Sequence, residues 1–178
     1  MSGLSQIYQA GRRESGFAVL GVHRLKEFSI VGTASEGKLT VYDTDTAPVS
    51  GTYGQSGTTV TVTDTAHGLS TGDVVGICFE TGTGGTATSG NYSITVTGAN
   101  TFTITMLNSD TITNDPACHY VANSGPNQEN PKRWLMCKVV AAGDSFANTF
   151  QIPNEGFVTK LGTYFLMSNL LEADVFYE

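Results

Sequence analysis

The chain has 178 residues, of which 39% are hydrophobic and only 14% are charged, and its formal net charge is −7 at pH 7. This length accommodates one ordinary domain or two small ones, and the hydrophobic fraction is sufficient for a packed core. Residues 39–131 contain eight Asp or Glu residues and no Lys or Arg, so neither nucleic-acid binding nor attachment to an anionic membrane is expected there.

The cysteines and the N-terminus favour folding in a reducing compartment. Cys78, Cys118 and Cys137 are an odd number at long spacings, without a Cys-x-x-Cys pair, and we expect all three to be reduced. Residues 1–6 lack the basic start and apolar core of a secretory signal. No stretch approaches the roughly 18 apolar residues of a membrane span. We therefore expect folding in the cytoplasm.

Residues 1–22 contain apolar side chains between four glycines but show no clear strand pattern. We expect an extended arm that becomes ordered on a neighbouring protein, because tails that bind nothing rarely keep large apolar groups. A frayed tail and a short helix remain as alternatives. Arg12 and Arg13 make the segment locally basic. Together with Phe17, they are the expected contacts with an acidic partner surface.

Residues 23–31 and 37–44 alternate between apolar and polar side chains and predict a β-hairpin. The connection between them, residues 32–37, is a cluster of turn-forming residues. The segment 43–48 contains Asp and Pro, which disfavour a strand interior, and it is expected to end the second strand.

Residues 50–115 form a distinct stretch that contains 18 of the 25 threonines in the chain. Apolar residues recur there at every second position, which is typical of antiparallel strands with one apolar and one Thr face. The expected strands are about 57–64, 73–80, 91–97 and 101–107. The Thr faces would hydrogen-bond to water or to a partner.

Residues 116–133 are rich in Pro, Asn and Gly and predict a loop. Strands are expected again at about 134–140, 146–152, 161–168 and 173–177. The composition shifts near residues 50 and 116, which predicts an all-β chain with an insertion. Residues 23–49 and 116–178 would form a discontinuous antiparallel β-sandwich, and 50–115 an inserted four-stranded β-module. The alternative is one continuous sandwich with long hairpins.

His67 is the most obvious candidate for catalysis, because Asp64, Ser70 and Asp73 lie nearby in the sequence. A Ser-His-Asp relay needs these groups within hydrogen-bond reach in a defined order, which neighbours in one hairpin loop rarely achieve. We instead interpret this segment as a structural turn in which glycines supply permissive backbone positions and Leu69 plugs the end of the sheet. The turn residues are His67, Gly68, Gly72 and Asp73.

The other candidates for ligand binding fit no known pattern, so no metal or cofactor is expected. Asp43 and Asp45 precede no calcium-binding loop, and Gly82–Gly85 lacks the Lys and the helix of a phosphate-binding loop. The potential zinc ligands do not have the sequence spacing of any known zinc site. These ligands are His23, Cys118, His119 and Cys137. Large aromatic residues are expected in the core rather than on a sugar-binding platform; they are Trp134, Tyr164, Phe165, Phe176 and Tyr177.

The segment His-Gly-Leu-Ser-Thr-Gly-Asp at 67–73 resembles a small β-module that recurs in virion proteins of tailed bacteriophages. In that module a Thr/Val strand precedes the motif, and a Val-rich strand, a Gly-rich loop, an Asn-Tyr strand and an Asn-Thr-Phe-Thr strand follow it. All of these parts occur here in the same order, with Asn-Tyr at 91–92 and Asn-Thr-Phe-Thr at 100–103.

The flanking halves of the chain are similar to small β-sandwich virion proteins. The similarity lies in Leu-Thr-Val-Tyr-Asp at 39–43, Ile-Pro-Asn-Glu-Gly at 152–156 and Leu-Gly-Thr-Tyr at 161–164.

Together, the resemblances imply a non-enzymatic structural protein of a phage virion. We favour a capsid-decorating or cement protein, with residues 1–22 docked on the major capsid protein and the Thr-rich module pointing outward. Such a protein is expected in multiple copies in the virion, and a homo-oligomer is one possible form. The virion would be assembled in the host cytoplasm. The alternatives are a tail, neck or baseplate component and a carbohydrate-binding adhesion module; an enzyme is not expected.

Overall fold

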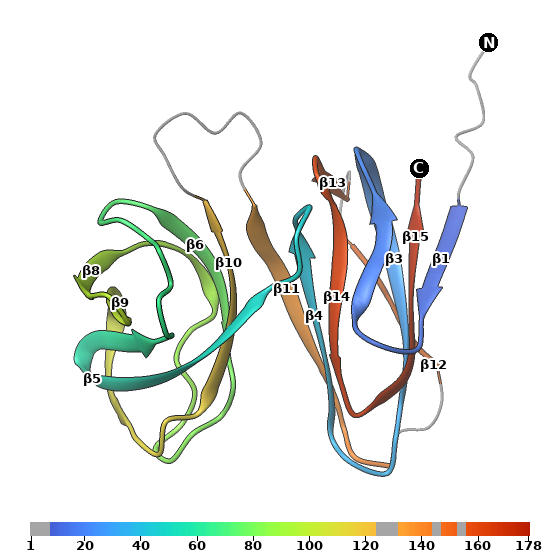
Figure 1. The fold of residues 1–178 in the computed structure, drawn as a ribbon. Helices are drawn as coiled ribbons and strands as arrows, with labels where there is room; N and C mark the ends of the chain where they lie inside the picture. Colours follow the sequence, from blue (N-terminus) through green and yellow to red (C-terminus); the bar gives the residue numbers. More distant parts are fainter. Residues whose placement is uncertain (1–7, 124–131, 144–146, 153–155) are drawn as a thin grey trace. The chain divides into compact units, whose positions relative to one another are not determined.

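The computed structural model describes four stretches of the chain, which are residues 8–123, 132–143, 147–152 and 156–178. The chain divides into two compact units (Figure 1). We call Met1–Ala47 with Leu135–Glu178 the sandwich unit, and Pro48–Trp134 the barrel unit. The described residues form fifteen β-strands and no helix, so none of them belongs to a helix able to cross a membrane. The predicted all-β class with antiparallel sheets is confirmed.

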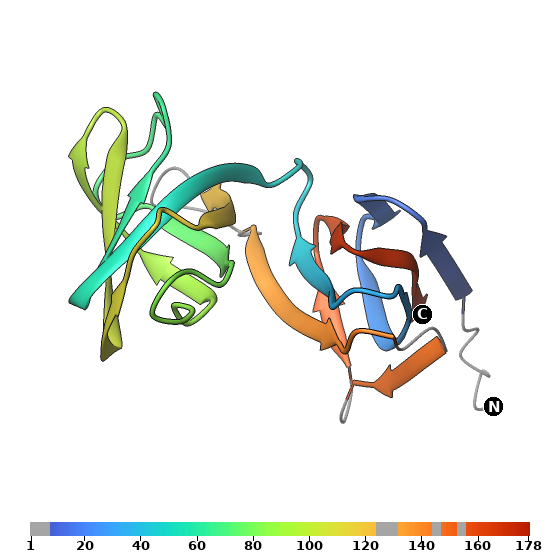
Figure 2. The same ribbon diagram turned by 90° about the horizontal axis from the view of Figure 1, so that it is seen from below.

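The sandwich unit consists of two sheets, which form separate layers (Figure 2). The first sheet has the strand order β1-β15-β3-β12, and β13 also pairs with β3. Its strands are β1 (Tyr8–Arg12), β15 (Leu170–Tyr177), β3 (His23–Gly32), β12 (Ala147–Gln151) and β13 (Phe157–Thr159). The second sheet has the order β11-β4-β14-β2. Its strands are β11 (Arg133–Val140), β4 (Gly37–Asp43), β14 (Gly162–Ser168) and β2 (Gly16–Leu20).

Apolar side chains from both sheets meet in the core of the sandwich unit. Phe28 in β3 and Phe165 in β14 are fully buried, with ring centroids 5.9 Å apart. Alternate residues of the strands point inward, as the two-residue period of a strand requires. The other fully buried members of this core are Leu25, Ile30, Leu39, Val41, Ala173 and Val175. Because these residues come from both ends of the chain, the sandwich is complete only when the two halves pair.

A buried carboxylate fixes the turn between β13 and β14. Asp43, the last residue of β4, is fully buried. Its Oδ1 accepts hydrogen bonds from the backbone N–H groups of Lys160 at 3.0 Å, Leu161 at 2.9 Å and Gly162 at 3.3 Å. Charge-assisted hydrogen bonds of this kind are stronger than neutral ones. The Asp43 carboxylate therefore attaches the turn to the end of β4.

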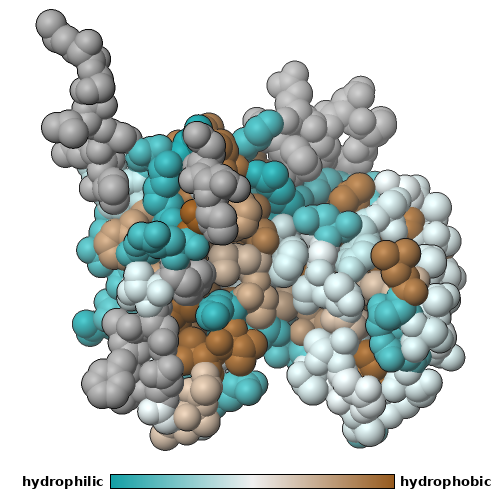
Figure 3. All heavy atoms as spheres, turned by 180° about the vertical axis from the view of Figure 1, so that it is seen from behind, coloured by the Kyte–Doolittle hydropathy of each residue, from teal (hydrophilic) through white to brown (hydrophobic). Residues whose placement is uncertain are grey.

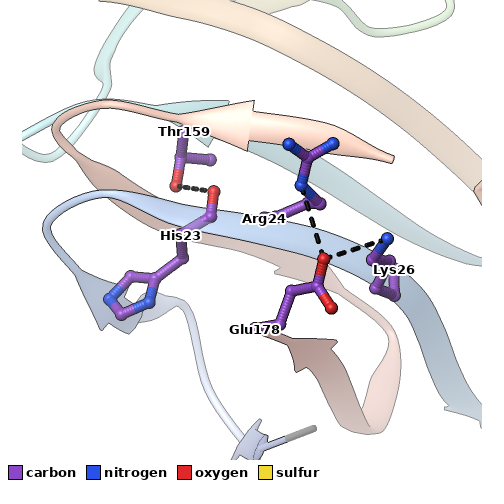
Figure 4. A network of polar contacts seen from close by, with 5 residues as sticks. All are labelled: His23, Arg24, Lys26, Thr159 and Glu178. Carbon is purple, nitrogen blue, oxygen red and sulfur yellow. Dashed lines mark hydrogen bonds and ion pairs between the residues drawn. The ribbon is translucent and has the colours of Figure 1, made fainter. Parts of the chain in front are cut away.

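The start of β3 is held from both sides (Figure 4). On one side, Glu178 Oε1 lies 3.4 Å from Arg24 Nε and 3.1 Å from Lys26 Nζ. On the other side, the hydroxyl of Thr159 in β13 donates to the carbonyl of His23 at 3.3 Å. Backbone bonds between Arg24 and Glu178 continue the ladder of β3 and β15 to the last residue of the chain.

The barrel unit contains one six-stranded sheet with the order β7-β6-β10-β5-β9-β8. Its strands are β7 (Gly90–Ser93), β6 (Val74–Phe79), β10 (Ala117–Asn123), β5 (Val49–Thr63), β9 (Thr101–Ile112) and β8 (Thr95–Gly98). The two end strands, β7 and β8, are separated in the sequence by Ile94 alone. One short segment therefore pairs with β6 at its start and with β9 at its end, so that the sheet curls back on itself (Figure 1).

The long strand β5 curls around the barrel core, so that its two ends approach each other. A Cβ atom on Gly51 would lie 2.8 Å from the carbonyl oxygen of Thr63, and only glycine permits this close approach. The first part of β5 pairs with β10 and the second part with β9. Side chains on its inner face enclose a core whose largest buried members are Tyr53, Tyr120, Phe79, Phe102, Ile77 and Ile104.

Residues 8–20 of the expected N-terminal arm belong to the sandwich, which corrects that expectation. Strand β1 pairs with β15, and β2 pairs with β14. Each strand is only five residues long and contains a glycine, so its apolar–polar alternation is weak in the sequence. Residues 1–7 of the expected arm lie outside the described residues.

The inserted unit is also larger than expected. It spans residues 48–134 rather than 50–115, because residues 117–123, expected as a loop, form strand β10 at the centre of the six-stranded sheet. Residues 124–131 of the expected loop and 153–155 of the Ile-Pro-Asn-Glu-Gly motif lie outside the described part of the chain. Strands β4 and β11, which flank the insertion, are neighbours in one sheet, so the barrel unit takes the place of a hairpin connection.

We expect Asp43→Asn to lower the free energy of unfolding of the sandwich unit by about 3 kcal/mol, because hydrogen bonds to a charged group contribute roughly 1.5–3 kcal/mol each. The substitution removes the charge and places an N–H group opposite backbone N–H donors. Urea unfolding followed by circular dichroism measures the effect, with Asp45→Asn, at an exposed position, as the matched control. Equal stability of both variants would contradict the role of Asp43.

Candidate functional site

His67 is bound on both sides of its ring by backbone groups. Its Nδ1 accepts a hydrogen bond from the N–H of Leu69 at 3.0 Å, and its Nε2 lies 3.2 Å from the carbonyl oxygen of Gly98. The first contact requires a bare Nδ1, so the ring proton sits on Nε2 and is donated to Gly98. The ring also meets Phe102 edge-on at 5.5 Å. Both nitrogens are thus used within the fold, and neither bonds to Ser70 or Asp64.

The rest of the His-Gly-Leu-Ser-Thr-Gly-Asp segment binds the strand that closes the barrel. Gly72 N–H donates to Ile94 at 2.9 Å, and Ile94 N–H donates to Asp73 at 3.0 Å. The hydroxyl of Thr71 accepts from Val96 N–H at 2.9 Å. Gly72 has a φ of 97°, a left-handed conformation that favours glycine. The loop therefore holds residues 94–98 in place.

Two further contacts give this loop its shape. The carboxylate of Asp73 accepts from Ser70 N–H at 2.9 Å, while Asp73 N–H donates back to the carbonyl of Ser70 at 3.0 Å. Gly68 has a φ of 67°, and Leu69 packs against the barrel core. Each residue that the sequence assigned to a structural turn thus has an identified conformational or hydrogen-bonding role.

The expected partner contacts lie on β1, on β2 and on the connection between them. The Arg13 side chain is 84% exposed and lies 4.0 Å from Glu172. The Arg12 side chain is 34% exposed and reaches Glu14 at 3.8 Å. Phe17 is half-buried and packs edge-on against Tyr164, with centroids 5.0 Å apart. Of the three, Arg13 is the most accessible to another protein.

The metal candidates are not assembled into a site. Within the described stretches, no group of three or more His, Cys, Asp or Glu side chains could hold a metal ion. His23 contacts the Leu20 carbonyl through Nε2 at 2.7 Å and packs edge-on against Tyr177. The thiols of Cys78 and Cys118 are buried, and that of Cys137 is half-buried.

A polar hollow of 410 Å³ lies where the two ends of β5 meet, and sequence analysis did not identify it. It is lined by Ser50, Gly51, Thr52, Thr63, Asp64 and Thr65. Asp64 Oδ2 accepts a hydrogen bond at 2.6 Å from the hydroxyl of Tyr120, a residue that is only 2% exposed. Next to the hollow, Ser50 Oγ and His119 Nδ1 are 2.9 Å apart. The Ser50–His119 and Asp64–Tyr120 pairs join residues more than 50 positions apart, so only the strand register could reveal them.

The outer face of β5, β9 and β8 carries rows of threonine side chains that are exposed or half-buried. The cross-strand neighbours are Thr59–Thr105, Thr61–Thr103 and Thr63–Thr101, and Thr95 pairs with Thr103 from β8. In Figure 3 the visible face of the barrel unit is largely pale, the colour of intermediate hydropathy, whereas the sandwich unit shows teal and brown patches. This threonine face is uncharged, and one of its members, Thr63, also lines the hollow.

Burial raises the pKa of two weakly acidic groups of the barrel core, the Cys118 thiol and the Tyr120 hydroxyl. Burial is the main cause that raises the pKa of Cys118 from 9.0 to about 12; a backbone hydrogen bond with Gly51 opposes the rise, and the nearby Asp64 and Cys78 add to it. The pKa of Tyr120 is raised by burial and by its hydrogen bond to Asp64. The folded state holds both protons more tightly than the unfolded state does. The stability that these two groups contribute is therefore fully present below their unfolded-state pKa values, and it is lost as the pH rises from those values toward the folded-state pKa values.

We expect His67→Ala to lower the stability of the barrel unit by about 1–2 kcal/mol, because it removes two hydrogen bonds from the loop. The backbone N–H groups of Ile94 and Val96 should then exchange with deuterium faster than in the unmodified protein. Native-state hydrogen exchange measures this effect. His23→Ala, in the sandwich unit, is the control and should leave exchange at these positions unchanged. Unchanged exchange in His67→Ala would contradict the closing role of the loop.

We expect the free energy of unfolding of the barrel unit to decrease as the pH rises from 9 toward 12, where Cys118 loses its proton in the unfolded chain but keeps it in the folded one. Urea unfolding across this range tests it. Cys118→Ala should flatten the dependence, whereas Cys137→Ala should preserve it. Identical slopes in the two variants would show that Cys118 does not contribute.

No protein-family model and no curated protein matches this chain. A solved structure, the phage phi92 endosialidase, is similar to it at a TM-score of 0.30 with 25% sequence identity. The match covers 62% of this chain and 15% of the endosialidase. Because a TM-score of 0.30 is too low to establish a shared fold, no function is inferred from this similarity.

Proposed function

We propose that this protein is a structural component of a tailed-bacteriophage virion, and more specifically a capsid-decorating protein that binds the major capsid protein. The observation that supports this most is the role of the His-Gly-Leu-Ser-Thr-Gly-Asp loop. Its groups hold the closing strand of the barrel, with His67 bonded to Gly98, Thr71 to Val96, and Gly72 to Ile94. The residues that carry the resemblance to the virion module therefore serve architecture.

The side of the sandwich unit formed by β1 and β2 is the proposed docking surface. In the described part of the chain, each of these strands pairs with one neighbour only. Three large side chains project from this region, which are Arg13 (84% exposed), Leu20 (64%) and Val22 (69%). Arg13 lies before the start of β2, and Leu20 and Val22 lie at and after its end, so this side offers a cation and apolar groups to a partner surface that combines acidic and apolar groups.

In this role the protein would stabilise the capsid by mass action at many equivalent sites. A protein that binds the assembled shell but not its dissociated subunits stabilises the shell by an amount that grows with its concentration. The acidic, Lys- and Arg-free stretch at 39–131 disfavours contact with the packaged nucleic acid. Attachment would therefore use the sandwich unit, and the barrel unit would stay available on the outside.

We expect the double variant Arg13→Glu/Val22→Asp to weaken binding to undecorated capsids of the encoding phage by roughly tenfold or more, which corresponds to about 1.4 kcal/mol or more. Deleting residues 1–22 would be a poor test, because it removes strands β1 and β2. Co-sedimentation with purified capsids measures the binding. Lys138→Glu/Val139→Asp is the matched control, since it changes a cation and an exposed valine on β11, at the opposite edge of the sheet from β2.

Three outcomes would contradict parts of this proposal. Equal binding by the double variant and the unmodified protein would exclude the β1–β2 side as the docking surface. Absence of capsid binding by the unmodified protein would exclude decoration. Antibody labelling confined to the tail of the particle would replace decoration by the tail, neck or baseplate alternative.

A further inference from the structure

The hollow between the ends of β5 has a fixed shape. Gly51 and Thr63 are twelve positions apart in the same strand, and the backbone of Thr63 passes so close to Gly51 that a Cβ atom there would lie 2.8 Å from its carbonyl oxygen. Strand β10 supports the first end through its pairing with β5, and β9 supports the second. Sheet pairing therefore holds the lining residues that belong to β5, and Asp64, just after the strand, is held by its N–H, which donates to the carbonyl of Asn100 at 3.0 Å. A pre-formed ligand site needs such fixed groups.

The carboxylate in this hollow is oriented by a buried group. Asp64 Oδ2 accepts the hydrogen bond from the Tyr120 hydroxyl at 2.6 Å, and Tyr120 is fixed in the core. Among the described residues, Oδ1 of Asp64 has no hydrogen-bond partner. A carboxylate that is held by one oxygen presents the other as a strong acceptor at a defined position.

Four hydroxyl-bearing residues line the hollow together with this carboxylate. Thr52, Thr63 and Thr65 line the hollow together with Ser50, and His119 fixes the Ser50 hydroxyl through the 2.9 Å contact. Each hydroxyl can donate one hydrogen bond and accept others. Such a set of groups matches a ligand that carries several neighbouring hydroxyls, because each ligand hydroxyl can also donate and accept.

Charge and size narrow the class of ligand. Asp64 is the one charged residue among the six that line the hollow, and a lone carboxylate disfavours an anionic ligand. A single carboxylate is also too few for a calcium site, which needs six to eight oxygen ligands. The volume of 410 Å³ lies at the lower end of the roughly 300–1,000 Å³ of small-molecule sites.

We propose that this hollow is a binding site for a neutral saccharide, with Asp64 accepting from ligand hydroxyls and with Ser50 and Thr63 completing the contacts. None of the six lining residues is aromatic, so no ring is available for a sugar to stack on and we expect a single site to bind weakly. Display in many copies would raise the effective affinity. The uncharged threonine face continues from Thr63 and offers hydroxyls to a longer chain. The site belongs to the barrel unit and does not depend on attachment to a capsid.

The test is a ¹⁵N-labelled NMR titration of the full chain with four neutral disaccharides, namely maltose, cellobiose, lactose and N,N′-diacetylchitobiose. At least one of them should shift the backbone resonances of residues 50–52 and 63–65 saturably at millimolar concentration. Glucose 6-phosphate, the anionic comparator, should bind these positions more weakly. Absence of any saturable shift at these positions, or stronger binding of the anion, would overturn the proposal.

Variants separate binding from folding. Asp64→Asn keeps the shape of the side chain and should weaken binding at least tenfold. Asp115→Asn, an exposed carboxylate outside the hollow, should bind as the unmodified protein does. Tyr120→Phe should weaken binding because Asp64 loses its orienting donor. If the melting temperature of Asp64→Asn falls, Thr63→Val provides the second test, and unchanged binding in all three site variants would overturn the proposal.

Discussion

The barrel unit depends on one constraint: a single short segment must pair with both edges of the curled sheet and so close it. Residues 90–98 pair with β6 before Ile94 and with β9 after it, so the segment has to leave one neighbour and join the other within one residue. The backbone groups of Ile94 are satisfied by Gly72 and Asp73. A buried N–H or C=O group without a partner at this position would lower the free energy of unfolding by about as much as the loss of one hydrogen bond. The His67 loop removes that cost and thereby makes closure possible.

The sandwich unit solves a related problem with a carboxylate. Its halves come from opposite ends of the chain, and the turn at residues 160–162 has to meet the end of β4 without a strand neighbour to receive its N–H groups. Asp43 accepts these hydrogen bonds from within the core. In both units a polar side chain thus completes backbone hydrogen bonding where the sheet ladder is interrupted.

The sequence allowed the all-β fold class and the alternation of buried and exposed side chains along the strands to be predicted, because both depend on local periodicity. The turn residues were predictable because glycine marks special backbone angles. Val60 and Val62, for example, are fully buried on the inner face of β5. The structure shows that β1, β2 and β10 were missed for a physical reason. Tyr8–Arg12 and Gly16–Leu20 are short strands stabilised by distant neighbours, and Ala117–Asn123 lies among loop-forming residues. The hollow could not be foreseen, since Ser50 meets His119, and Asp64 meets Tyr120, only through the cross-strand register.

The position of the insertion has a consequence for variation between relatives. Strands β4 and β11 are adjacent in their sheet, and adjacent strands lie about 4.8 Å apart. A module of any length can be joined there if its own ends lie close together, and the sandwich core, which draws on neither β5 nor β10, would be left intact. Genetic recombination could therefore exchange the barrel unit in one step, while the sandwich unit with its own core is inherited unchanged.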